Sequence, residues 1–183
     1  MLAGHFGAGL VLKSRYPSVP LLAILVAAEL PDLLWVLFAS LGWEKLAAVP
    51  AHPLRPDTLG PMVFSHDVSM ILIYACILGA VGMLLSSLEG CLALALALLS
   101  HLGLDLLVHA PDIGVGGPWV PVHVGLDLWR RAPFFSWLLE MLMVLGGGTL
   151  YLHARVPGRD GAGRARTLVG VLVAAHLAAL AVW

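Results

Sequence analysis

The chain has 183 residues, of which 60% are hydrophobic and only 11% are charged. Soluble domains carry about 25% charged residues, so this composition indicates a protein surrounded by lipid. The formal net charge is -1, and the basic stripe needed for nucleic-acid binding is missing, which excludes that class of partner. The sequence does not indicate a protein partner. Its length suits one domain, and we predict a single membrane-embedded helical domain over residues 1–183.

The apolar segments predict an all-α, polytopic helical bundle with about five membrane spans and a short N-terminal helix. A standard span needs about 20 residues, so the helix predicted over 2–12 would be a thin or re-entrant one. Cys76 and Cys91 lie inside apolar segments and do not form a CxxC pair, which favours reduced packing residues. The five predicted spans cover residues 19–41, 68–88, 90–109, 134–153 and 167–183.

Pro31 interrupts the first predicted span, between Leu30 and Asp32. Proline removes a backbone donor and crowds the preceding turn, so we expect a kink or break here. A break inside a membrane is tolerated only where protein or a wet cavity receives the freed backbone groups. The stretches 42–65 and 110–133 are rich in proline or glycine and predict irregular loops outside the membrane. The span 134–153 also contains Glu140 and three consecutive glycines, which we expect to interrupt it.

His101, Asp105 and His109 are spaced four residues apart at the end of an apolar run. In a helix, this spacing places them on one face, one turn above another. Imidazole and carboxylate groups suit zinc, manganese or iron. The alternative is a helix end solvated by a loop. The apolar surroundings favour a functional role for His101 and Asp105, because an ionisable residue in such a segment is costly unless it is paired or ligated.

The pattern of His101 and Asp105 recurs once, as His123 and Asp127 in the second loop. A single repeat over about a dozen residues is weak support for a duplication. His123 and Asp127 are either a second ligand pair or part of an interfacial helix capped by Arg130 and Arg131. We favour the interfacial helix.

The basic residues divide unequally between the two sides of the predicted bundle. One side would hold Lys13, Arg15, Arg155, Arg159, Arg164 and Arg166, and the other would hold Lys45, Arg55, Arg130 and Arg131. The positive-inside rule places the first group in the cytoplasm. The two proline- and glycine-rich loops would then be extracytoplasmic.

Ionisable residues from several segments reach a similar depth in this arrangement. With a rise of about 1.5 Å per residue, Asp32 and Glu140 lie roughly 20 Å from the basic side, and His101, Asp105 and His5 lie at about 16, 22 and 12 Å. His66 enters from the opposite loop. This coincidence indicates a shared site inside a hydrocarbon core about 30 Å thick. His176, alone in its span, is interpreted as a hydrogen-bonded packing residue.

Four short motifs occur in order over the first two thirds of the chain: Gly4-His5, Leu30-Pro31-Asp32, Ser65-His66, and Ser100-His101 with Asp105. They resemble the pattern of the YdjM-like family of bacterial inner-membrane metal-dependent hydrolases. Two departures are visible. The family often has a second Asp and a His after Leu-Pro-Asp, where this chain has Leu34 and Trp35, and it often has His-Arg-Gly ahead of the helix-opening His, near Pro61–Val63 here.

Because of these departures, this chain could bind either one metal ion or two. The residues that could replace the missing ligands are Glu29, Asp67, His109, Asp112 and Glu140. The order of ligands is also similar, more distantly, to that of zinc-dependent phospholipase C, which implies a phosphoester substrate.

These observations lead to one main hypothesis, a membrane-embedded metal-dependent hydrolase of the cytoplasmic (inner) membrane. Its substrate would be a membrane lipid or lipid-linked phosphoester, and its site would lie toward the extracytoplasmic half. The metal would be a divalent ion, with zinc as first choice and manganese or iron as alternatives, and Glu140 or Asp67 would be the general base. The predicted metal ligands are His5, Asp32, His66, His101 and Asp105. The alternatives are an ion, proton or metal transport or binding protein, and a non-catalytic membrane interaction module.

Overall fold

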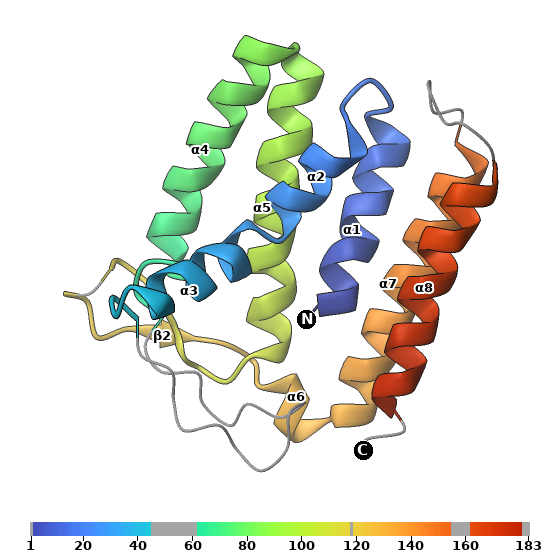
Figure 1. Ribbon diagram of the computed structural model, residues 1–183. Coiled ribbons are helices and arrows are strands. Elements are labelled where there is room, and N and C mark those ends of the chain that lie inside the picture. The colour runs from blue at the N-terminus through green and yellow to red at the C-terminus, as the bar shows by residue number, and fades with distance from the viewer. Residues whose placement is uncertain (1, 45–61, 118, 155–161, 181–183) are drawn as a thin grey trace.

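The computed structural model describes residues 2–44, 62–117, 119–154 and 162–180. These residues form a mostly helical bundle with one short antiparallel ladder (Figure 1). The predicted all-α class is therefore confirmed. The elements are α1 (Leu2–Arg15), α2 (Leu21–Ala28), α3 (Leu30–Ser40), α4 (Val68–Leu85), α5 (Leu88–Val108), β1 (Ile113–Gly114), β2 (His123–Val124), α6 (Leu128–Arg131), α7 (Pro133–His153) and α8 (Ala162–Leu180).

Within the described ranges, three helices are long and apolar enough to cross a membrane, namely α4, α5 and α7. The pair α2 and α3 passes the same test together but is bent by 56°, so it gives a fourth span only if the bent pair is counted as one. The apolar part of α8 covers Ala165–Ala178 and is shorter than a span. The prediction of a membrane protein is supported in this coarse form, whereas the predicted number of about five spans is not.

The break predicted near Pro31 is confirmed, and it begins at Glu29, between α2 and α3. Pro31 lies in the first turn of α3, where its missing N–H costs least. The last carbonyls of α2 consequently lack helical partners and need donors from elsewhere. One of these donors comes from α5, because His101 Nδ1 bonds the carbonyl oxygen of Ala28.

Helix α1 lies between α5 and α7 and packs most closely against α7 (Figure 1). A side chain at Gly147 would lie 2.2 Å from the backbone oxygen of Gly7, and one at Gly7 would lie 2.5 Å from the backbone carbon of Met143. The two backbones can approach this closely only because both positions lack a Cβ. The glycines of α7 therefore do not interrupt that helix, contrary to our expectation. They let α1 approach and so position His5.

Helices α4 and α5 form a hairpin joined by a tight turn at Ser86 and Ser87. Gly82 and Gly90 face each other there, because a Cβ at either position would lie within 2.6 Å of the other's backbone oxygen. Helix α2 packs against α5 and α1. Helix α5 therefore packs against α4, α2 and α1, and it also contacts α3 and α6. Both cysteines are free. Cys91 is partly buried, as a packing residue would be, whereas Cys76 is exposed, so the predicted packing role does not hold for Cys76.

The loop after α5 differs from the predicted interfacial helix. His123 is exposed in β2, paired with Gly114 of β1, and Asp127 adopts a left-handed conformation with φ of 61°. Asp127 accepts a hydrogen bond from Arg130 Nε at 2.9 Å. The two residues therefore do not stand on one helix face as a ligand pair. The helical part of this loop is only α6, which begins after Asp127.

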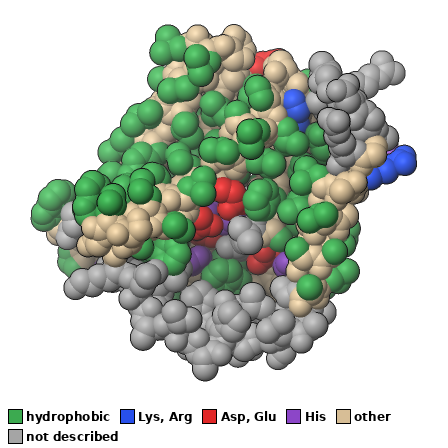
Figure 2. Space-filling view, viewed as in Figure 1, with side chains coloured by type: hydrophobic (Ala, Val, Ile, Leu, Met, Phe, Trp, Pro, Cys, Tyr) green, Lys and Arg blue, Asp and Glu red, His purple; other side chains and the backbone are tan. Residues whose placement is uncertain are grey.

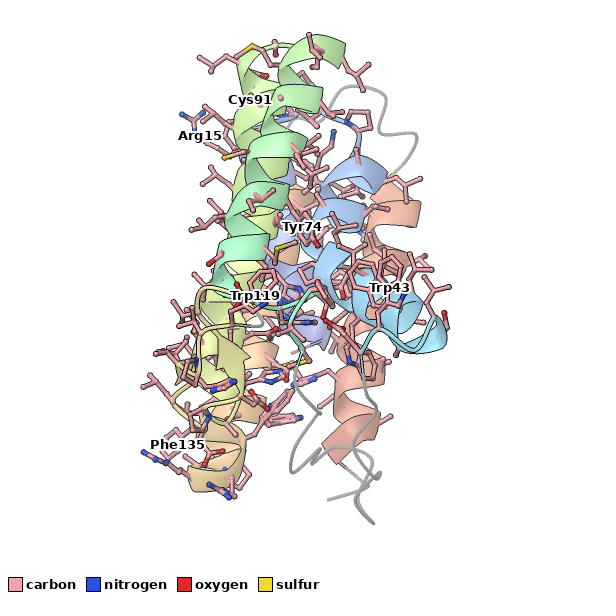
Figure 3. The ribbon with its side chains drawn as sticks, turned by 90° about the vertical axis from the view of Figure 1, so that its left-hand side faces the viewer. Arg15, Trp43, Tyr74, Cys91, Trp119 and Phe135 are labelled. Carbon is pink, nitrogen blue, oxygen red and sulfur yellow. The ribbon has the colours of Figure 1, made fainter. Side chains whose placement is uncertain are left out.

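Large aromatic side chains are exposed on the part of the molecule away from Arg15 and Cys91. Trp43, Trp119 and Phe135 are 61%, 87% and 63% exposed, and Figure 3 shows the two tryptophans near mid-height and Phe135 close to the end opposite Arg15 and Cys91. Exposed tryptophans are enriched where a membrane meets water. The exposed tryptophans therefore have the character of interfacial residues.

Candidate metal centre

Helix α5 presents two of the predicted ligands toward the interior of the bundle. His101 Nε2 lies 3.0 Å from Asp105 Oδ2, as expected for residues one turn apart. Both side chains are buried. The face they share points toward α1 and toward the break between α2 and α3, which bring the other ligands.

His66 and Asp32 approach the same pair from different segments. His66 precedes α4, and its Nε2 lies 3.3 Å from His101 Nε2 and 3.6 Å from Asp105 Oδ2. Asp32 is in the first turn of α3, with its Oδ1 3.2 Å from His66 Nε2 and 3.9 Å from His101 Nε2. Two helices, α3 and α5, and the segment before α4 therefore bring one donor atom from each of four residues into one cluster.

The spacing of these four donor atoms suits a metal ion. Zinc ligands at about 2.0–2.1 Å in a tetrahedron lie about 3.3 Å from one another. Five of the six distances among the four atoms range from 3.0 to 3.9 Å, close to that value. Two overlapping groups of three could each hold a metal ion, namely Asp32, His66 and His101, and His5, His101 and Asp105. We call this set, Asp32 Oδ1, His66 Nε2, His101 Nε2 and Asp105 Oδ2, the four-donor set.

Hydrogen bonds behind the two histidines fix which ring nitrogen faces the set. His101 Nδ1 donates to the carbonyl oxygen of Ala28 at 2.7 Å, which is one of the carbonyls freed at the end of α2. Ser65 Oγ donates to Glu44 Oε2 at 2.8 Å, so it accepts from His66 Nδ1, also at 2.8 Å. In both rings the proton on Nδ1 is held away from the set, and a neutral ring presents its Nε2 lone pair inward.

The four-donor set therefore contains two lone pairs and two carboxylates at close range. Such groups repel one another in a low-dielectric interior, so protons or a cation must neutralise them. The short distances between these donor atoms and the oriented rings favour a cation. The chemistry of the donors, two imidazoles and two carboxylates, fits zinc and also manganese or iron.

His5 of α1 adds a fifth predicted ligand beside the set. Its ring stacks on that of His101, with 3.7 Å between ring centroids and 13° between planes, and it is completely buried. Its Nε2 lies 3.2 Å from Asp105 Oδ1, yet neither ring nitrogen has a hydrogen-bond partner among the described residues. All five predicted metal ligands are thus brought together.

The two predicted general bases lie elsewhere. Glu140 Oε2 accepts hydrogen bonds from the backbone N–H groups of Ala3 and Gly4, at 3.2 and 3.4 Å. Asp67 caps α4 through Ser69 N and Met70 N, and its other oxygen accepts from Gly117 N at 2.8 Å. Both carboxylates are therefore used to join backbone segments. This geometry does not favour either residue as the base.

Two acidic residues that support the site were missed or given little weight from the sequence. Glu44 binds Ser65 and the N–H groups of Phe64 and Ser65, so it holds the segment that carries His66. The sequence offers no signal for Glu44, which lies in a loop far from the motifs. Glu29 is buried at the helix break, and its Oε1 has no hydrogen-bond partner among the described residues. Its place next to Leu30-Pro31-Asp32 is a usable signal.

The site reaches the surface on the side of the bundle formed by α3, α1 and α7. Figure 2 shows acidic and histidine side chains in a recess of this face, bordered by hydrophobic side chains. The Asp32 side chain is 41% exposed, whereas those of His66, His101 and Asp105 are almost fully buried. Asp32 is therefore the member of the set that is accessible from the surface of the protein.

Comparisons with known proteins found no relative of this chain. No protein-family model matches the chain, and no match was found among curated proteins or solved structures. The resemblance to the YdjM-like family thus rests on the four short motifs alone and stays a prediction. The chain is mostly helical, and three of its described helices are apolar and long enough to span a membrane. Inside the bundle, histidine and aspartate side chains lie close enough together to bind a divalent cation.

Proposed function

We propose that this protein is a membrane-embedded, metal-dependent hydrolase that acts on a lipid or lipid-linked phosphoester. The observation that carries the proposal is the four-donor set, in which both histidines are held with Nε2 facing Asp32 and Asp105. A divalent cation, zinc in the first instance, would be held by these four side chains. His5 lies beside them against Asp105.

A bound divalent cation supplies two things to such a reaction, a lowered pKa of about 7 for a water molecule and stabilisation of charge on phosphoryl oxygens. The chain must then supply a proton acceptor. Glu29 suits this role better than Asp67 or Glu140, because its Oε1 is buried without a hydrogen-bond partner among the described residues. It also interacts electrostatically with Asp32, His101 and Asp105.

The surroundings of the recess support a lipid substrate. Helix α3 carries Asp32 and also exposes Leu33, Val36 and Leu37, which are 51%, 59% and 48% exposed. An acyl chain could lie along this apolar surface while its phosphoester group reaches Asp32. The phosphoester itself is taken from the more distant similarity to zinc-dependent phospholipase C.

The same proposal places the protein in the cytoplasmic membrane with about five passes. Helices α2 and α3 would cross as one broken span, and α8 would form the last. The recess would face the extracytoplasmic half, toward the exposed tryptophans. In a Cys76→Ser, Cys91→Ser background, Trp119→Cys should react with an impermeant thiol reagent in intact cells and Gly163→Cys should not. The reverse labelling pattern would invert this orientation.

Glu29→Gln is the variant that tests the hydrolase proposal. Purified protein in phospholipid vesicles should contain zinc and release a water-soluble phosphate-containing product from the phospholipid. Glu29→Gln removes the proton acceptor but no ligand of the four-donor set, so its metal content should be unchanged and its turnover should fall by about 100-fold or more. Elemental analysis and product release measure the two quantities separately.

Glu89→Gln is the matched control, because Glu89 binds Ser18 at the opposite end of the bundle and should affect neither quantity. A protein that holds zinc but hydrolyses neither phospholipids nor lipid-linked phosphoesters would overturn the hydrolase proposal and leave a metal-binding or transport protein. Equal turnover in Glu29→Gln and the unmodified protein would remove Glu29 from the mechanism.

A further inference from the structure

The short helix α6 ends in two arginines, Arg130 and Arg131, whose side chains are 70% and 73% exposed. Arg130 is held in place, because its Nε and Nη2 lie 2.9 and 2.7 Å from Asp127 Oδ2. Arg131 Nε lies 3.8 Å from the same oxygen, which is too far for a hydrogen bond. Two guanidinium groups therefore share one carboxylate, and the pair keeps a net positive charge.

Asp127 is a fixed base for these arginines. Its side chain is buried, and its backbone adopts the left-handed conformation noted above. Its N–H donates to the carbonyl oxygen of His109 at 2.6 Å, which joins it to the end of α5. A side chain that is already held in one position loses less freedom when it binds a ligand. Arg130 is therefore presented at the surface in a largely preset position.

Acidic side chains nearby in the sequence do not cancel this charge at the surface. Between residues 106 and 140, the charged residues are Asp112, Asp127, Arg130, Arg131 and Glu140. Asp127 and Glu140 are buried, and the Asp112 side chain is only 17% exposed. The exposed charge of this stretch is therefore positive, and it favours an anionic ligand.

Exposed aromatic rings follow the two arginines directly. One residue separates α6 from α7, and the first turn of α7 carries Phe134 and Phe135, both exposed. The ring of Phe134 contacts those of Phe135 and Trp137, with centroids 5.9 and 6.2 Å apart. Figure 3 shows Phe135 close to the end of the molecule opposite Arg15. Clustered apolar rings beside exposed positive charge are typical of a surface that contacts lipid.

We propose that the α6–α7 junction, formed by Arg130, Arg131, Phe134 and Phe135, binds an anionic phospholipid. The guanidinium groups would donate to the phosphate oxygens, whose geometry they match, and the phenyl rings would contact the acyl chains. A headgroup with net negative charge is favoured over a zwitterionic one, because the arginines repel the ammonium group of the latter. A soluble phosphate would leave the aromatic rings uncovered.

The α6–α7 junction adjoins the candidate metal centre. The ring of Trp129, in α6, lies 5.0 Å from that of His109, centroid to centroid. His109 Nε2 in turn lies 3.7 Å from Asp105 Oδ1. A lipid bound at the junction would thus be held on the same side of the bundle as the metal ligands. Lipid binding there does not require hydrolysis, so it can be tested apart from the proposed function.

A lipid titration tests this site. The full-length protein in a neutral detergent is titrated with short-chain phosphatidylglycerol, and its melting temperature is measured at each concentration. A ligand of the folded state raises the melting temperature, and the concentration dependence gives the affinity. Phosphatidylcholine with the same acyl chains should bind far more weakly, and inorganic phosphate should have little effect. Added salt should weaken the binding of phosphatidylglycerol, because salt screens the exposed arginines.

Arg131→Gln removes one positive charge at the surface and should weaken phosphatidylglycerol binding by about 10-fold or more. Arg131→Lys keeps the charge but loses the planar fork of donors, so its affinity should be intermediate. Arg15→Gln is the matched control, because Arg15 is exposed at the opposite end of the molecule and should leave the affinity unchanged. Glu29→Gln should also bind normally, which keeps the result independent of hydrolysis.

Three results would overturn the lipid site. They are equal affinity for phosphatidylglycerol and phosphatidylcholine, unchanged phosphatidylglycerol binding in Arg131→Gln, and an equal stabilisation by inorganic phosphate, which would assign the arginines to a soluble anion. Phosphatidylglycerol binding that is weakened in Arg131→Gln and retained in Arg15→Gln would support the site, whether or not the protein hydrolyses a phosphoester.

Discussion

Two groups of buried histidines and carboxylates occur in this bundle, and they differ in what surrounds each polar atom. The first is the four-donor set together with His5. The second, which we call the α7–α8 clasp, consists of Trp137, Glu140 and His176. Both include residues of apolar helices, and from the sequence alone Glu140 could be placed at the same depth as the ligands.

The clasp is satisfied by its own members and by backbone groups. His176 Nε2 donates to the carbonyl oxygen of Trp137 at 2.9 Å, and Trp137 Nε1 donates to the carbonyl oxygen of His176 at 3.2 Å. The two rings stack with 8° between their planes. Glu140 accepts from the first turn of α1. Each of these contacts pairs a donor with an acceptor, as structural polar groups in an apolar interior require.

The four-donor set has the opposite balance. Its ring protons are used outward, on Ala28 and Ser65, so lone pairs and carboxylates remain inside. Both groups consist largely of buried polar side chains, so burial alone does not distinguish them. The difference is an excess of acceptors over donors, and that excess is what indicates a cation.

The largest expected effect follows from removing members of the four-donor set. His101→Ala and Asp105→Ala should each remove most of the bound metal, because ligands of one ion are strongly coupled. The double variant should then lose little more than either single one. Losing one ligand also strands its buried partner, so the melting temperature in detergent should fall in each case.

His176→Ala is the control that separates the two groups. It breaks the clasp and should lower the melting temperature, yet the metal content measured by elemental analysis should not change. Stoichiometric metal in the His101→Ala, Asp105→Ala double variant would falsify the metal centre and remove the distinction between the two groups.

A smaller effect is expected from the residues behind the ligands. Ser65→Ala removes the acceptor of the His66 Nδ1 proton and the link to Glu44, so the ring is free to turn or to protonate on the other nitrogen. Loss of such an outer contact typically weakens metal affinity by about 10–100-fold. Competition with a zinc chelator measures the change. Ser100→Ala is the matched serine control and should leave the affinity unchanged, because among the described residues the Ser100 hydroxyl bonds only the carbonyl of Ala97.

Much of the site could be predicted because its signals are local. The spacing of His101 and Asp105 fixes their common face on a helix, and Pro31 fixes a break that turns Asp32 inward. Helix depth then relates segments that are distant in the sequence. These arguments use only helix geometry and the cost of burying charge.

The rest depends on tertiary contacts that no local pattern encodes. Glu44 supports His66 across a loop, and the carbonyl of Ala28 becomes an acceptor only because α2 ends against α5. From the sequence, the three glycines of α7 predict an interruption of the helix, because their partner, Gly7 of α1, lies far away in the sequence. Glu140 was expected at the site because depth says how far along a helix a residue lies and not which neighbour it faces.

The smallest expected effect concerns Glu140, and it sharpens the comparison most directly. Glu140→Gln keeps an acceptor for Ala3 N and Gly4 N but removes the negative charge at the start of α1. A carboxylate at a helix N-terminus contributes about 1 kcal/mol, so the melting temperature should fall slightly. Metal content should be unchanged, because the carboxylate bonds the backbone of α1 and none of the five ligands.

Asp32→Asn makes the matched change, a carboxylate to an amide, inside the four-donor set. Asn keeps the shape but is a poorer metal ligand, so bound metal should fall while the melting temperature of metal-free protein changes little. If Glu140→Gln lost metal as Asp32→Asn does, the clasp and the metal centre would be one unit. A buried carboxylate's hydrogen bonds to backbone amides would then be no guide to whether it serves structure or metal binding, and Glu140 would return as a candidate for the reaction.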